Sequence, residues 1–213
     1  MGSRLPGSKP DRLAYWYFRL NGFLTTESFV IHPETGSEQR TDADVLGVRF
    51  AQRSEGGRYP LFDDPTVADS GTPINVIVAE VKTSKCSLNG PWTNPQAGNM
   101  REALRAIGCV PLDAEADATG ALFRDGRWSD DTVSVRLFAV GEYRDPDLVL
   151  GENQQLIWHD IISFAMDRFS SYKTRKSAVG QWDADGQLLQ KASLLRDEEQ
   201  IRDYFKLQPL QAR

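Results

Sequence analysis

Residues 74–83 read INVIVAEVKT, a strongly hydrophobic stretch that ends in charged residues. The apolar run over residues 74–81 predicts a β-strand that is buried on both faces. Because side chains alternate between the two faces of a strand, Glu80 and Lys82 point to one side while Val81 packs on the other. Charged side chains at the end of so apolar a strand are costly without partners, so the stretch also predicts a polar site there.

The sequence around this strand alternates between helical and extended patterns. Residues 11–20 have the apolar spacing of a helix, and Asn21-Gly22 is a typical helix end. The full set of predicted elements is a helix at 11–20, strands at 23–32, 45–50 and 74–81, a helix at about 97–107, a strand at 133–140, and helices at 154–172 and 197–205. This order predicts an α/β fold with a mixed central sheet flanked by helices.

No composition shift or linker divides the chain, so we expect a single domain over residues 1–213. Its core spans about 11–145, and a helical C-terminal part spans about 152–206. The chain has 213 residues with a net charge of −5 and 40% hydrophobic residues, which excludes disordered and fibrous classes and argues against a generally basic nucleic-acid binder. Two cysteines, no apolar leader and no run of eighteen apolar residues predict a reduced, cytoplasmic protein that does not enter a membrane.

Carboxylates mark the ends of the two most apolar strands. Asp42 and Asp44 open the strand at 45–50, and Glu80 closes the strand at 74–81. If these strands pair, Asp44 and Glu80 converge, and with the Val81 carbonyl they form a site of oxygen ligands that suits Mg²⁺, with Mn²⁺ as a substitute. An ammonium group beside such a site, here that of Lys82, orients a water molecule or offsets charge on a phosphate.

The arrangement Asp44…Glu80-Val81-Lys82, after a first helix, resembles the PD-(D/E)XK nuclease superfamily, which includes restriction enzymes, Holliday-junction resolvases and Mrr-like nucleases. The resemblance covers about residues 11–140 and implies a restriction-endonuclease-like αβββαβ core. It also implies that Asp44 and Glu80 hold Mg²⁺ and that Lys82 assists the nucleophile. Many members carry a glutamate on the first helix. This chain offers only Asp11 there, either as that ligand or as a helix cap.

Other polar residues near the predicted site have two interpretations each. His32, at the end of the first strand, contacts a phosphate or is structural, and Asp42 is an accessory residue or part of a turn. Trp92, in the segment after the third strand, stacks on a base or plugs the sheet. The ion pair Glu80–Lys82 itself has the alternative of a structural pair of small energetic value.

Basic residues supply candidate phosphate contacts. Lys85 follows the predicted site directly. The strongest basic cluster in the sequence comprises Arg168, Lys173, Arg175 and Lys176, with no acidic residue between them. It serves either as a phosphate-binding surface or as a complement to the dipole of the helix it closes. The acidic stretch that includes Asp63 and Asp64 is a second source of carboxylates or a solvated loop.

The sequence therefore predicts a Mg²⁺-dependent endonuclease that hydrolyses phosphodiester bonds in DNA, in a setting of bacterial defence or repair. Because one subunit of this size cuts one strand per site, cutting both strands predicts a homodimer or a larger assembly. The alternative is a catalytically inactive subunit with a nuclease fold that binds nucleic acid or a protein partner.

Overall fold

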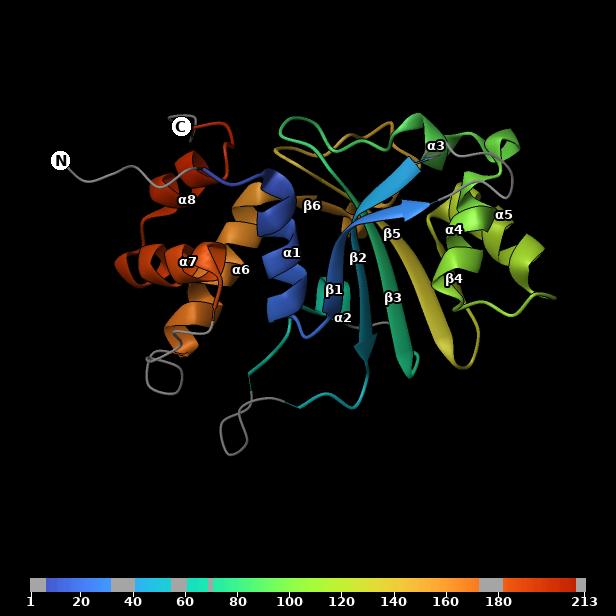
Figure 1. Ribbon diagram of the computed structural model, residues 1–213, viewed down its shortest axis with the longest axis horizontal. Coiled ribbons are helices and arrows are strands. Elements are labelled where there is room, and N and C mark those ends of the chain that lie inside the picture. The colour runs from blue at the N-terminus through green and yellow to red at the C-terminus, as the bar shows by residue number, and fades with distance from the viewer. Residues whose placement is uncertain (1–6, 32–40, 55–60, 69–70, 173–181, 210–213) are drawn as a thin grey trace.

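The computed structural model describes residues 7–31, 41–54, 61–68, 71–172 and 182–209. Within these ranges the chain forms α1 (Pro10–Leu20), β1 (Leu24–Ile31), β2 (Thr41–Phe50), α2 (Pro65–Ala68), β3 (Ile74–Val81), α3 (Gly90–Thr93), α4 (Asn99–Ile107), α5 (Glu115–Asp125), β4 (Arg127–Ser129), β5 (Val133–Gly141), β6 (Gln155–Ile157), α6 (Trp158–Ser171), α7 (Ala184–Leu195) and α8 (Glu198–Tyr204). Figure 1 shows their arrangement.

A mixed sheet with the strand order β1-β2-β3-β5-β4 forms the centre of the molecule, and β6 pairs with β5 as well. The strands β1, β2 and β3 are antiparallel neighbours. β3 runs parallel to β5 over its whole length, from Ile74 opposite Val133 to Val81 opposite Val140. A parallel pair needs a crossover connection, which the segment carrying α3, α4 and α5 supplies. The predicted α/β class with a mixed sheet is confirmed.

Helices cover both faces of this sheet (Figure 1). α1 and α6 pack on one face, α7 packs against α6 and α1, and α8 packs against α7, in one core that includes Val45, Ile77 and Phe138. α4 and α5 pack on the other face, over Val76 and Val135. Every residue of β3 after the first is buried, as expected for a strand covered on both sides. Of the C-terminal helices, α6 therefore forms part of the layer that covers the sheet, and α7 and α8 lie outside this layer.

Several predicted boundaries differ from the structure. The helix predicted at 154–172 begins only at Trp158, because Gln155–Ile157 extends beside β5 as β6. β2 starts at Thr41 rather than at residue 45, so it contains both Asp42 and Asp44. The helices α5 and α7 were not predicted. No helix in the described part of the chain is long and apolar enough to cross a membrane.

Candidate functional site

The Glu80 carboxylate, at the end of β3, is held by three hydrogen-bond donors. Only 3% of the residue is exposed. The indole Nε1–H of Trp92 donates to Oε2 at 3.0 Å, while Asn89 Nδ2 and Lys82 Nζ both donate to Oε1. Glu80 therefore has the partners that its burial requires. One is the predicted neighbour Lys82, and the other two come from the segment that follows β3.

Asp44 meets β3 at the same end of the sheet. Its Oδ2 accepts a hydrogen bond from the backbone N–H of Val81 at 2.7 Å. The ladder between β2 and β3 ends at Val45 opposite Ala79, and one step further places Asp44 opposite Glu80. Because a strand residue directs its N–H and C=O toward the same neighbour, the Val81 carbonyl faces the β2 side as well. The two predicted strand ends do converge.

A distortion of the β1–β2 hairpin lies at Asp44. The ladder skips the pair Ser28 and Asp44, and Ser28 has a φ of 48°, in the left-handed region that few residues other than glycine adopt. Ala43 and Leu46 belong to the core on the α4 and α5 side, whereas Val45 belongs to the core on the α1 side. The regular alternation of faces therefore breaks at Asp44, and such breaks re-aim a side chain at the end of a sheet.

The first turn of α1 adds a third carboxylate near this point. The N-cap of α1 is Lys9, with Pro10 as the first helical residue, so Asp11 is not the helix cap. The charge of Asp11 acts on Asp44, and the charge of Lys82 acts on Asp11. In Figure 1, α1 begins at the same end of the molecule at which β3 ends. Asp11 thus belongs to the neighbourhood of Asp44.

Burial raises the pKa of Asp11, Asp44 and Glu80 above their ordinary values. The charge of Asp11 raises the pKa of Asp44 further, and the charge of Asp44 does the same to Glu80. The Val81 N–H opposes the rise in the pKa of Asp44, and Lys82 opposes the rise at Glu80. Titratable groups that act on one another in this way are often found at functional sites.

The available ligands at this site are oxygen atoms, the type that a hard cation such as Mg²⁺ prefers, but they are few in number. In the described ranges, no group of three or more His, Cys, Asp or Glu side chains is arranged to hold a metal ion. Mg²⁺, however, is commonly bound through one or two carboxylates and keeps several water molecules. Asp44 and Glu80 supply two carboxylates, and the Val81 carbonyl faces β2, the strand that carries Asp44. A cation that binds Glu80 Oε1 has to displace Lys82 or Asn89.

The electrostatic coupling between Asp44 and Glu80 is directly testable. In Asp44→Asn the amide oxygen still accepts from Val81, but the negative charge that raises the pKa of Glu80 is gone. We therefore expect the pKa of Glu80 to fall, as followed by carboxyl ¹³C NMR during a pH titration. Asp42→Asn is the matched control, because Asp42 is not among the main charges that act on Glu80. An unchanged pKa of Glu80 in Asp44→Asn would contradict the convergence of the two side chains.

The other predicted site residues take different positions. Trp92 is 3% exposed and packs in the core with α4 and α5. It therefore covers the sheet, as in the second interpretation, and its ring is not available to stack on a base. Lys85 is exposed, and its ammonium pairs with Asp145 at 2.8 Å. Asp42 is half-buried, and its charge acts on Asp44. The predicted candidates His32, Lys173, Arg175 and Lys176 lie outside the described residues.

Arg168 does not reach the surface, contrary to the prediction of a phosphate contact. Its guanidinium donates to the Phe62 carbonyl at 2.7 Å and to Asp63 at 2.9 Å, and 4% of the residue is exposed. Arg49 and Arg53 donate to the same carboxylate. Asp63 is thus neither solvated nor part of the candidate site. It joins β2 and α6 to the segment before α2.

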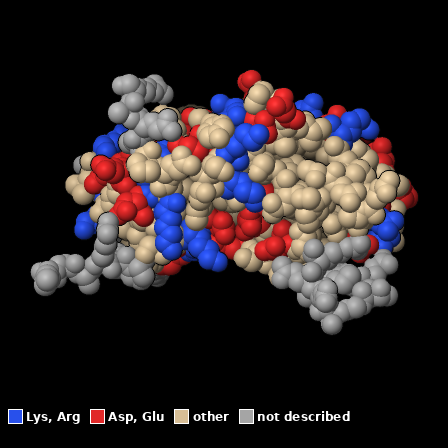
Figure 2. All heavy atoms as spheres, turned by 90° about the horizontal axis from the view of Figure 1, so that it is seen from above, with Lys and Arg blue, Asp and Glu red and all other residues tan. Residues whose placement is uncertain are grey.

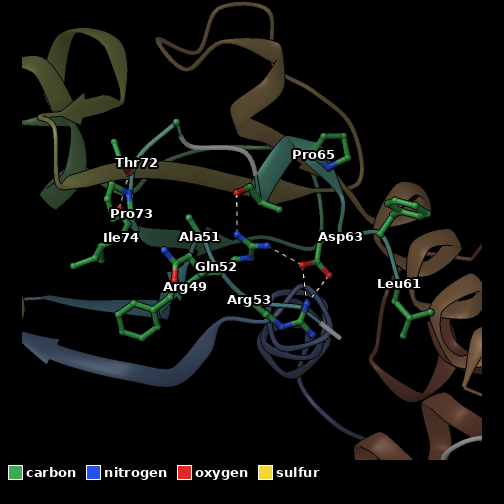
Figure 3. A pocket seen from close by; sticks show the side chains of 14 residues that line it. Arg49, Ala51, Gln52, Arg53, Leu61, Asp63, Pro65, Thr72, Pro73 and Ile74 are labelled. Carbon is green, nitrogen blue, oxygen red and sulfur yellow. Dashed lines mark hydrogen bonds and ion pairs between the residues drawn. The ribbon is translucent and has the colours of Figure 1, made fainter. Parts of the chain in front are cut away.

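An open cavity of about 840 Å³ lies beside this arginine cluster, between the C-terminal end of β2 and the start of β3 (Figure 3). Figure 3 shows Arg49 and Arg53 both directed at Asp63. The side chains of Leu61, Pro65 and Ile74 contribute apolar walls. Glu80 closes β3 at its other end, so this cavity is separate from the candidate site.

Charges of both signs lie on the end of the molecule where β3 finishes. Figure 2 looks onto this face and shows acidic side chains near its middle with basic ones beside them. A broad area without charged residues lies to the right, toward the side that carries α4 and α5 in Figure 1. The described residues of this face therefore do not form a uniformly basic surface.

Comparisons with family models, with curated proteins and with solved structures give no match to this chain. The contacts described above therefore carry the functional argument. Within the described part of the chain, Asn89 contributes a contact to the site that sequence reasoning did not assign to it. The segment Asn89-Gly90-Pro91-Trp92 has the composition of a turn, and that composition does not indicate which strand end the amide contacts.

Proposed function

We propose that the protein is a Mg²⁺-dependent endonuclease that hydrolyses phosphodiester bonds in DNA. The observation that carries this proposal is the convergence of Asp44, Glu80 and Lys82 at one end of the sheet, where burial and the charge of a neighbouring carboxylate raise the pKa of both carboxyl groups. Carboxylates paired with an ammonium suit a phosphate ester, since the ammonium complements the negative charge of the reacting group.

The order of elements supports membership in the PD-(D/E)XK superfamily. The longer elements come in the order α1, β1, β2, β3, α4, α5 and β5, with the short elements α2, α3 and β4 between them, which agrees with an αβββαβ core. Asp11 on α1 stands where many members of that superfamily carry a glutamate, and its charge acts on Asp44. This placement favours Asp11 as an accessory residue of the site.

Each residue then has a distinct role. Asp44 and Glu80 would hold the cation, which when bound would supply activation of water and stabilisation of negative charge on the phosphate. Lys82 is anchored by Glu80 and keeps its ammonium beside the carboxylates, where it orients the attacking water or offsets charge on the phosphate. The buried setting of Glu80 strengthens these electrostatic contacts, because the local dielectric constant is low.

A second candidate function is a non-catalytic subunit that binds nucleic acid or a protein partner. The observation that favours it is the set of three donors on Glu80, which satisfies the carboxylate without a cation. A structural carboxylate would have the same contacts. For the endonuclease, DNA is the proposed partner, and cutting of both strands calls for a homodimer or a larger assembly.

Cleavage of supercoiled plasmid with Mg²⁺ or Mn²⁺ tests the proposal. The wild-type protein should nick the plasmid and lose this activity in EDTA. Lys82→Ala should lower the cleavage rate by about 10²-fold, the effect typical of removing one group that stabilises transition-state charge. Lys191→Ala, on the exposed side of α7, is the matched control and should cleave at the wild-type rate. Absence of cleavage of plasmid, linear duplex, single-stranded DNA and RNA with either metal would favour the non-catalytic candidate.

A further inference from the structure

The short helix α3 places two donors on the buried carboxylate of Glu80. Asn89 is its N-cap residue and Trp92 lies within it. The backbone N–H of Trp92 donates to the Asn89 carbonyl at 2.9 Å, so the two residues are held in one turn. Pro91 sits in the first turn and fixes its backbone. One rigid turn therefore delivers both side chains to Glu80.

The Trp92 indole is fixed by packing as well as by its hydrogen bond. It lies in the same core as Met100 and Leu104 of α4. An indole N–H is only a donor, and burying it without an acceptor is unfavourable. Glu80 Oε2 is its acceptor at 3.0 Å. The packing of the indole in the core therefore fixes the position of Glu80 Oε2.

The two oxygens of Glu80 differ in how many donors they have. Oε1 accepts from both Lys82 and Asn89, whereas Oε2 accepts only from Trp92 among the described residues. Each carboxylate oxygen offers about two lone pairs. Oε1 is therefore fully used, and Oε2 keeps one acceptor site. Asn89 is exposed and thus easier to displace than the buried indole.

We propose that Trp92 is a positioning residue of the candidate site, and that its indole N–H fixes the Glu80 carboxylate in the orientation in which it binds a divalent cation. Asn89 is the exchangeable partner of that carboxylate. This inference rests on the proposed function, because it assumes that Glu80 is a cation ligand. Outer partners of metal ligands typically change metal affinity by about 10–100-fold.

Trp92→Phe tests this role, because it keeps an aromatic ring in the core and removes the N–H. We expect the dissociation constant for Mn²⁺, measured by calorimetry or electron paramagnetic resonance on the full chain, to rise by about 10–100-fold. Because a cation that binds Oε1 displaces Asn89 or Lys82, Asn89→Ala should leave the dissociation constant for Mn²⁺ unchanged or lower it. These measurements do not require DNA cleavage.

Trp128→Phe is a matched control from the same chain. The Trp128 indole also donates to a carboxylate, that of Asp117 at 2.9 Å, and packs in the same core as Trp92. If Trp92 is only structural, both variants lose stability and neither changes the affinity for Mn²⁺. Positioning predicts that Trp92→Phe alone changes it, and equal affinities in both variants would overturn the proposal.

A measurement on the wild-type protein covers the case in which Trp92→Phe fails to fold. Titration with Mg²⁺ should shift the indole ¹⁵N–H signal of Trp92 and leave that of Trp128 in place. An unmoved Trp92 signal in a protein that binds Mg²⁺ would overturn the positioning role alone. Failure of the wild-type protein to bind either cation would instead overturn the metal-dependent function, and the positioning role with it.

Discussion

Glu80→Gln is expected to lower the proposed DNA cleavage by more than about 10³-fold, because it removes the proposed cation ligand and the anchor of Lys82 together. Glutamine has nearly the shape of glutamate but carries no charge. Lys82, Asn89 and Trp92 all donate to this side chain, so both carboxylate oxygens have a donor. The NH₂ group of glutamine would therefore face another donor in either orientation. The measurement is the rate of plasmid nicking at saturating Mg²⁺, together with the dissociation constant for Mn²⁺.

Glu199→Gln serves as the control for this change, because Glu199 lies exposed in α8. It should leave both quantities at their wild-type values. Circular dichroism of Glu80→Gln has to show the wild-type fold, so that lost cleavage reports on the site. A Glu80→Gln protein that is folded and cleaves at the wild-type rate would contradict the assignment of Glu80 as a ligand.

Asp63→Asn is expected to destabilise the protein by about 3–5 kcal/mol, the usual consequence of breaking a buried ion pair. The side chain of Asp63 is 8% exposed and accepts from Arg49, Arg53 and Arg168. Removing its charge leaves the buried guanidiniums of Arg49 and Arg168 without that counter-ion. Urea unfolding at pH 7 measures the loss as a fall in the free energy of unfolding. Asp131→Asn, at an exposed position, should change it by no more than about 0.5 kcal/mol.

The effect of Asp63→Asn should depend on pH in a defined direction. Burial alone would raise the pKa of Asp63, but the hydrogen bonds from Arg49, Arg168 and Arg53 outweigh it and hold the pKa below its ordinary value of 3.8. The stabilisation is therefore fully present above that value and is lost as pH falls through the lower pKa of the folded state. The difference between wild-type and Asp63→Asn should be constant near neutral pH and shrink in acid. A difference that grows on acidification would contradict the ion-pair role.

Local patterns were sufficient to predict much of the fold. The apolar runs at 74–81 and 133–140 are buried parallel neighbours, and the helix predicted at about 97–107 is Asn99–Ile107, ended by Gly108 in a left-handed conformation. These features depend on periodicity and on glycine, which act within a few residues. The strand β6 was mistaken for the start of a helix, because its extended conformation comes from pairing with β5.

The positions of single polar side chains were harder to predict. Arg168 stands in a basic run and was expected at the surface, yet it pairs with Asp63, 105 residues away. Trp92 has two interpretations in sequence, and its burial over the sheet decides between them. Such contacts depend on how helices and loops pack against the sheet. Amino-acid composition does not predict this packing.

The sequence by itself determined the α/β class, the strand that ends in Glu80-Val81-Lys82, and the shared face of Glu80 and Lys82, because the period of two in a strand is a local property. Only the tertiary structure brought Asp44 to the Val81 N–H, placed Asp11 near Asp44, and set Trp92 and Asn89 on Glu80. The reason is physical. These side chains meet through strand register, a break in the β1–β2 ladder and helix packing, which are fixed only when distant segments bury their apolar surfaces together.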